Sequence, residues 1–168
     1  MRRLMMTIVA ALMLAALLVS LPALAQDVIT TAIGGGPNGI PALNANLYNP
    51  YGVAVDTAGN YYIAAYNQNR VFKVNAAGTI SVVAGSGAQG YSGDGVVGGA
   101  TMASLYHPYA LAVDTASPAN IYIADYSNYV VRKVTGSTGT ITTVAGIPAS
   151  PGYSGDGGKG TLAQIYSP

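Results

Sequence analysis

The sequence contains no cysteine and no glutamate, and its only histidine is His107. Without cysteine, no disulfide can stabilise the fold, although small secreted domains often depend on disulfides. Charged residues make up only 8% of the 168 residues, and the formal net charge is +1. This balance argues against a basic nucleic-acid-binding surface. Stability therefore has to come from packed sheets, and electrostatics points to no partner.

Signatures of catalysis are missing as well. There is no thiol nucleophile, no histidine cluster for a metal, and no recognisable carboxylate pair of the glycosidase type. The glycine run 34–36 follows an expected strand but opens no helix, so it is a turn rather than a dinucleotide-binding loop. This segment is therefore predicted to be non-enzymatic, with no cofactor and no metal.

Glycine and tyrosine are abundant instead, with 22 and 13 residues. An amphipathic helical protein would favour Glu, Lys, Leu and Ala, which is not the composition seen. The composition favours an all-β protein of short strands joined by tight turns.

Residues 1–25 are predicted to be a signal peptide. Arg2 and Arg3 precede an apolar run over residues 4–21, and small residues then lead to a cleavage site after Ala25. The chain is therefore expected to be secreted, in the periplasm or outside the cell, with no membrane attachment after cleavage. The alternative is an uncleaved anchor helix, because the run is just long enough to cross a bilayer.

An internal repeat of about 60 residues is the strongest feature of the sequence. Four segments recur in order, namely 50–56 as 108–114, 60–66 as 120–126, 79–85 as 140–146, and 90–95 as 152–157. Each unit predicts four strands, which in the first unit are 52–56, 61–66, 70–75 and 79–84. The first of these is nearly all apolar, so we expect it to be buried on both faces. Four antiparallel strands per tandem repeat indicate a β-propeller blade, whereas a sandwich or an open solenoid explains the pattern less well.

The repeat divides residues 26–168 into parts of a propeller. The parts are 28–49, the end of a preceding blade (with a strand at 29–34) and a linker; 50–107, a blade and its loop; and 108–168, a blade, its loop and a lead-in. Two blades cannot close a ring, because propellers have about four to eight. We therefore expect an incomplete ring whose main partners are missing blades of the same propeller. Self-association of identical fragments is the alternative.

The repeated motifs resemble the NHL repeat of bacterial secreted propellers, with teneurin-like propellers as distant relatives. The resemblance rests on Pro-Tyr-Gly-Val-Ala-Val-Asp at 50–56, its continuation to Val74, and the Gly-Tyr-Ser-Gly-Asp-Gly loops, and it covers 28–168. The Asp that the family carries in its second strand is Asp125 in one repeat but Ala65 in the other. The Arg that begins its third strand is Arg70 in one repeat but Val130 in the other.

The resemblance implies a non-enzymatic binding or scaffold module for a protein, peptide or glycan, which would contact loops on one rim. The alternative is the N-terminal part of a propeller enzyme, lactonase-like or lyase-like, with its catalytic residues in missing blades.

The two Gly-Tyr-Ser-Gly-Asp-Gly loops are the candidate binding sites. Their glycines allow positive φ, and their carboxylates can accept hydrogen bonds from a ligand. A hard cation is another possible ligand, but one carboxylate per loop is few for calcium. The favoured interpretation is nevertheless structural, with Asp capping turn N–H groups and Tyr packing on the neighbouring blade. The candidate binding residues are Tyr91, Ser92, Asp94, Tyr153, Ser154 and Asp156.

The tyrosines form a second candidate surface, suited to a partner or a glycan, although strand packing is the favoured interpretation because aromatic residues favour sheets. The set includes Tyr61, Tyr62, Tyr66, Tyr91, Tyr122, Tyr126, Tyr129 and Tyr153. His107 is expected to be structural, because the equivalent positions of the other copies hold Asn49 and Ser167.

Overall fold

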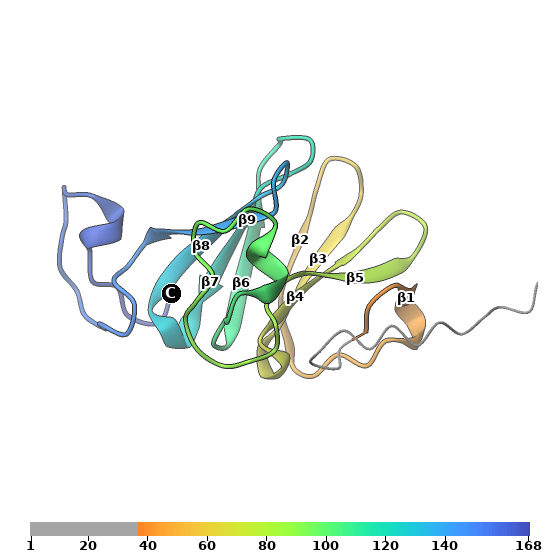
Figure 1. Ribbon diagram of the computed structural model, residues 1–168, viewed down its shortest axis with the longest axis horizontal. Helices are drawn as coiled ribbons and strands as arrows, with labels where there is room; N and C mark the ends of the chain where they lie inside the picture. The colour runs from red at the N-terminus through yellow and green to blue at the C-terminus, as the bar shows by residue number, and fades with distance from the viewer. Residues whose placement is uncertain (1–36) are drawn as a thin grey trace, which may run out of the picture. The chain divides into compact units, whose positions relative to one another are not determined.

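Two antiparallel β-sheets follow one another along the chain (Figure 1). The computed structural model describes residues 37–168, all within the compact unit Ala32–Pro168. The predicted signal peptide and the predicted strand at 29–34 lie outside the described residues. Over residues 37–168, no helix is long and apolar enough to cross a membrane.

The first sheet has the order β1-β5-β4-β3-β2. Its elements are β1 (Ile40–Pro41), η1 (Ala42–Asn44), β2 (Pro50–Val55), β3 (Tyr61–Ala65), η2 (Tyr66–Gln68), β4 (Arg70–Val74) and β5 (Thr79–Ala84). Side chains close its hairpins, because the Asp56 carboxylate accepts the N–H groups of Ala58 and Asn60. The Asn75 side chain accepts the N–H of Thr79 in the same way.

The second sheet repeats this plan in the order β6-β7-β8-β9. Its elements are η3 (Gly99–Met102), β6 (Pro108–Val113), β7 (Ile121–Asp125), η4 (Tyr126–Asn128), β8 (Val130–Thr135), β9 (Thr140–Ala145) and η5 (Gly160–Leu162). Asp114 closes its first hairpin by accepting the N–H groups of Ala116 and Asn120. The predicted fold class is therefore confirmed: the chain is all-β, with two consecutive blades of an incomplete β-propeller.

Three details differ from the sequence prediction. The innermost strand β2 is not buried on both faces, since Val53 and Val55 are 66% and 52% exposed. The reason is that β2 packs on β6 of the other blade and that, within residues 37–168, no second blade packs on its remaining side. Strand β1 was not predicted, and Tyr66 begins a 3-10 turn rather than ending a strand.

The core lies in two places. The larger cluster joins the blades, with Tyr62, Val71 and Ala84 on one side and Ile123 and Ile141 on the other. The smaller cluster lies on the opposite face of the first blade. There the segment 40–47 covers its buried members Ala65, Phe72 and Ile80.

Candidate functional site

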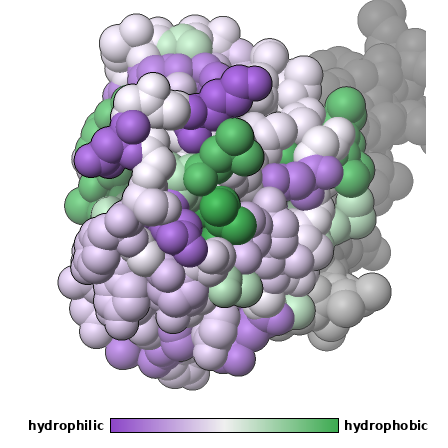
Figure 2. All heavy atoms as spheres, turned by 90° about the vertical axis from the view of Figure 1, so that its left-hand side faces the viewer, coloured by the Kyte–Doolittle hydropathy of each residue, from purple (hydrophilic) through white to green (hydrophobic). Residues whose placement is uncertain are grey.

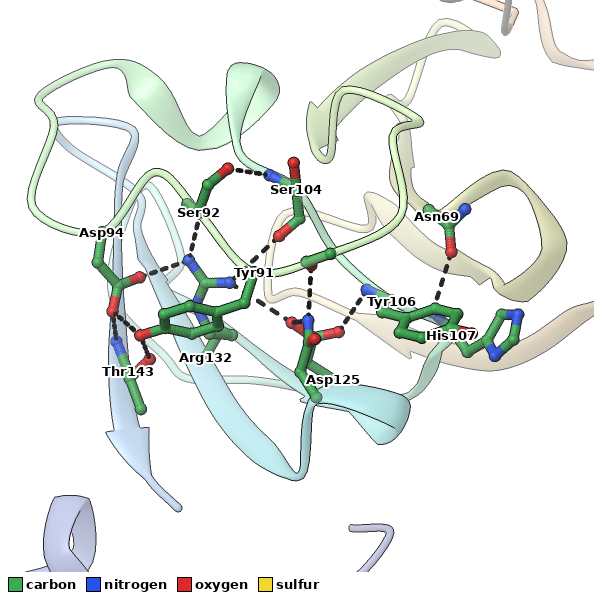
Figure 3. A network of polar contacts seen from close by, with 12 residues as sticks. Asn69, Tyr91, Ser92, Asp94, Ser104, Tyr106, His107, Asp125, Arg132 and Thr143 are labelled. Atoms are coloured by element: carbon green, nitrogen blue, oxygen red, sulfur yellow. Dashed lines mark hydrogen bonds and ion pairs between the residues drawn. The ribbon is translucent and has the colours of Figure 1, made fainter. Parts of the chain in front are cut away.

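The first Gly-Tyr-Ser-Gly-Asp-Gly loop, residues 90–95, lies across the outer strands of the second blade (Figure 3). Asp94 Oδ2 accepts the N–H of Thr143 in β9 at 2.9 Å, and the Tyr91 hydroxyl donates to the same oxygen at 2.8 Å. The Tyr91 hydroxyl also lies 2.7 Å from the Thr143 hydroxyl. Two side chains expected to face a ligand therefore contact the neighbouring blade.

Arg132 of β8 is the centre of this contact, and its side chain is fully buried. Its guanidinium forms an ion pair with Asp94 and donates to the Ser92 carbonyl at 2.9 Å. The Tyr91 ring covers the guanidinium, with 4.6 Å between the charge centre and the ring centroid. Arg132 Nε is buried and has no hydrogen-bond partner among the described residues. We call Tyr91, Ser92, Asp94, Arg132 and Thr143 the inter-blade latch.

Behind the latch lies a second, fully buried carboxylate, Asp125. One oxygen accepts the N–H of Tyr106 at 2.7 Å, and the other accepts from Asn128 Nδ2 at 2.8 Å and lies 3.4 Å from Arg132. Burial raises the pKa of Asp125 to about 6, although these donors and the arginine charge oppose the shift.

Asp94 has the opposite shift. Its burial alone would raise the pKa, but hydrogen bonds from Tyr91 and Thr143 and the charge of Arg132 prevail, so its pKa is lowered. Of the two carboxylates beside Arg132, Asp94 forms the closer ion pair, so it chiefly balances the buried arginine. Sequence reasoning missed Arg132, although one signal was present: the first repeat has the apolar Phe72 at the equivalent strand position.

The second loop, residues 152–157, has a similar backbone at its last two equivalent glycines, but within residues 37–168 it has no partner like Arg132. Gly155 has a φ of +96°, close to the +90° of Gly93 in the first loop. Within the described residues, neither ion pair involves Asp156, and Tyr153 is 86% exposed. Ser154 bonds only within its own segment, donating to Gln164 Oε1 at 2.9 Å. The six candidate residues thus fall into two separate groups, and a ligand-binding role for either group stays a prediction.

A cluster of aromatic rings in mutual contact gathers where the innermost strands of both blades begin. We call it the tyrosine cluster; its members are Tyr51, Tyr66, Tyr106, His107, Tyr109 and Tyr126. Tyr51 of β2 and Tyr109 of β6 stack at 4.9 Å between centroids, and they are 55% and 43% exposed. The two blades therefore present one continuous aromatic surface.

His107 supports this cluster from behind. Its ring stacks on Tyr66 at 4.1 Å with 7° between the planes, and its Nδ1 lies 2.9 Å from the Ser127 hydroxyl. Burial lowers the pKa of His107, which favours its uncharged form. His107 also has a positive φ of 57°, as do its equivalents Asn49 and Ser167, so the position is one of repeated backbone geometry.

The other tyrosines do not form one rim. Tyr62 is buried in the inter-blade core and donates to Asp56 Oδ2 at 3.0 Å, and burial, reinforced by that carboxylate, raises the pKa of Tyr62 to about 12. Tyr122 lies under Lys133, and Tyr129 and Tyr153 each lie near Tyr166. Only part of the predicted tyrosine surface is therefore brought together. Among residues 37–168, no three potential metal-ligating side chains of His, Asp or Glu converge.

Comparison with known proteins supports the fold. No family model matches the chain, and no curated protein matches it. A solved protein of unknown function from Bacteroides thetaiotaomicron is 26% identical, with a TM-score of 0.59 over 71% of this chain. Two solved structures of auxiliary nutrient binding proteins are each 22% identical. The one from Bacteroides thetaiotaomicron has a TM-score of 0.56 over 69% of this chain, and the one from Bacteroides ovatus has 0.50 over 65%.

The chain spans only 28%, 30% and 28% of the lengths of these three proteins. Their similarity is thus to a part of each fold, and the activity of a whole protein is not carried over with it.

Proposed function

We propose that this chain contributes two blades to a secreted, non-enzymatic propeller of the NHL-repeat type that binds a glycan through the tyrosine cluster. The observation that carries the proposal is the stacked pair Tyr51 and Tyr109, contributed by two blades and left about half exposed. Exposed aromatic rings that are already held in place lose little conformational entropy on binding, which favours their use as contact residues.

The chemistry of the cluster favours a neutral, hydroxyl-rich ligand. The cluster contains no Asp, Glu, Lys or Arg, and burial lowers the pKa of its one histidine, His107, which favours the uncharged ring. The tyrosine rings offer flat apolar faces for the C–H face of a sugar ring, while their hydroxyls provide hydrogen-bonding groups at the edge. Two proteins of similar fold are named as nutrient binding proteins, and a glycan is compatible with that description.

Affinity electrophoresis through gels that contain neutral polysaccharides tests the proposal. The double variant Tyr51→Ala with Tyr109→Ala should bind the retarding polysaccharide roughly tenfold more weakly than wild type, because it loses both stacking faces. Tyr61→Ala is the matched control, since Tyr61 is similarly exposed on β3 but lies outside the cluster, and its binding should be unchanged. If no polysaccharide retards wild type, or if all three proteins are retarded equally, the proposal is contradicted.

A further inference from the structure

Each blade is covered by the chain segment that precedes it in the sequence, and we call this segment the cover of that blade. The covers of the first and second blades form equivalent hydrogen bonds. In the second blade, Asp94 accepts the N–H of Thr143 in β9 at 2.9 Å. In the first blade, the side chain of Asn38 accepts the N–H of Val82 in β5 at 3.1 Å. Val82 and Thr143 are equivalent, because they pair with Phe72 and Arg132 of the adjacent strands. Asn38 therefore occupies the place of Asp94.

The covering residue matches the side chain that it covers. Where the cover presents the neutral Asn38, the buried residue of the third strand is Phe72; where it presents Asp94, the residue is Arg132. Electrostatics explains the match, because a buried guanidinium needs a carboxylate to offset its desolvation, whereas a buried phenyl ring does not. The residue at this position of a cover thus indicates whether the buried side chain beneath it, in the third strand of the blade, is apolar or charged.

A third cover is present in residues 152–163, and it presents an aspartate. In its backbone, a loop glycine closely approaches a later alanine, as in the cover of the second blade. A Cβ on Gly155 would lie 2.7 Å from Ala163, and one on Gly93 would lie 2.7 Å from Ala103. Asp156 stands where Asp94 stands in the first loop, and it is exposed.

The sheet beside this third cover has the layout of an inter-blade face. Val83 of the first blade packs into the core between the blades, whereas its equivalent in β9, Val144, is exposed. Figure 2, which looks at this side, shows an apolar patch within a largely polar surface. The exposed apolar side chains of β9 and η5 are Val144 and Leu162.

We propose that the face formed by β9 and residues 152–163 docks a further propeller blade whose third strand carries a buried arginine at the position of Arg132, paired with Asp156. A second copy of this chain does not fit this face. Its first blade has Phe72 at that position, and the segment 40–47 already covers it.

The test extends the full chain after Pro168 with a second copy of residues 109–168, which continues the repeat in register and supplies a second Arg132. In the extended chain, Asp156→Asn should lower the melting temperature by about 3–6 °C, against less than about 1 °C in the original chain. Nitration of Tyr153, followed by mass spectrometry, should be slower in the extended chain, because the docked blade covers the ring.

The matched control is Arg132→Phe in the appended copy, which recreates the pairing of the first blade. With phenylalanine there, Asp156→Asn should no longer destabilise the extended chain. An equal effect of Asp156→Asn on both chains, or an effect that persists beside phenylalanine, would overturn the proposal. An appended repeat that stays unfolded would overturn the proposal too. So would sedimentation that shows the original chain self-associating and Asp156→Asn abolishing that association.

Discussion

The two blades have the same backbone plan but fill one equivalent interior position with opposite chemistry. In the first blade, Phe72 is buried with Ala65 under an apolar segment. In the second, Arg132 and Asp125 replace this pair, and the cover provides the carboxylate of Asp94. The strand registers at these positions are the same in both sheets. The repeat therefore determines backbone geometry, while a few paired substitutions give each blade its own partner.

Some tyrosines are the same in both blades, and they form a shared surface. Tyr51 and Tyr109 stand at equivalent positions, as do Tyr66 and Tyr126, and together they form one surface. Repetition of a side chain that points outward creates an extended contact surface, such as the tyrosine cluster. Variation of a side chain that points inward creates specificity between neighbouring blades.

The largest effect is expected from breaking the polar pair in the second blade. Arg132→Leu leaves Asp125 buried without its cation, so the free energy of unfolding should fall by about 3–5 kcal/mol. Urea denaturation followed by circular dichroism measures this change. A loss below about 1 kcal/mol would mean that the latch is not a buried, coupled network.

The comparison of the blades also supplies the control for this variant. Arg132→Phe combined with Asp125→Ala transfers the apolar pair of the first blade to the second, and it should recover part of the loss because the fully buried carboxylate of Asp125 is no longer left without its cation. If this double variant is as unstable as the sum of its single variants, the two positions are not equivalent in energy.

A smaller effect is expected from pH. Because the pKa of Asp125 is raised to about 6, ionisation of this group costs the folded state stability as pH rises from about 4 to about 6. The lowered pKa of Asp94 acts below this window, and the lowered pKa of His107 makes stability rise with pH. The difference in melting temperature between wild type and Asp125→Asn removes the shared effect of His107. As pH rises through this window, the melting temperature of wild type should fall relative to that of Asp125→Asn. A constant difference would contradict the raised pKa of Asp125.

Local sequence patterns were enough to predict the blades. The spacing of apolar residues and turn residues predicted a strand at 79–84, and the structure has β5 at Thr79–Ala84. Asp56 and Asn75 occur at hairpins because their side chains bond the backbone two to four residues away. These interactions are short in sequence, so a single copy of the repeat contains all the information they need.

The latch and the tyrosine cluster depend instead on contacts between distant residues. Asp94 and Arg132 are separated by 38 positions, and nothing in the loop motif indicates which strand it covers. The same motif also recurs in residues 152–157, where no ion pair within the described part of the chain involves its aspartate. Burial of the innermost strand was predicted wrongly for a related reason, since an apolar run does not reveal how many neighbouring blades pack against it.

The most direct test compares the two identical loops within one protein. Asp94→Asn weakens the pairing of a buried arginine and should lower the free energy of unfolding by about 1–3 kcal/mol. Asp156→Asn alters an exposed carboxylate and should change it by less than about 0.5 kcal/mol. Urea denaturation of the two variants side by side gives both values. A clearly larger loss for Asp94→Asn supports the inter-blade latch, whereas equal losses would contradict it.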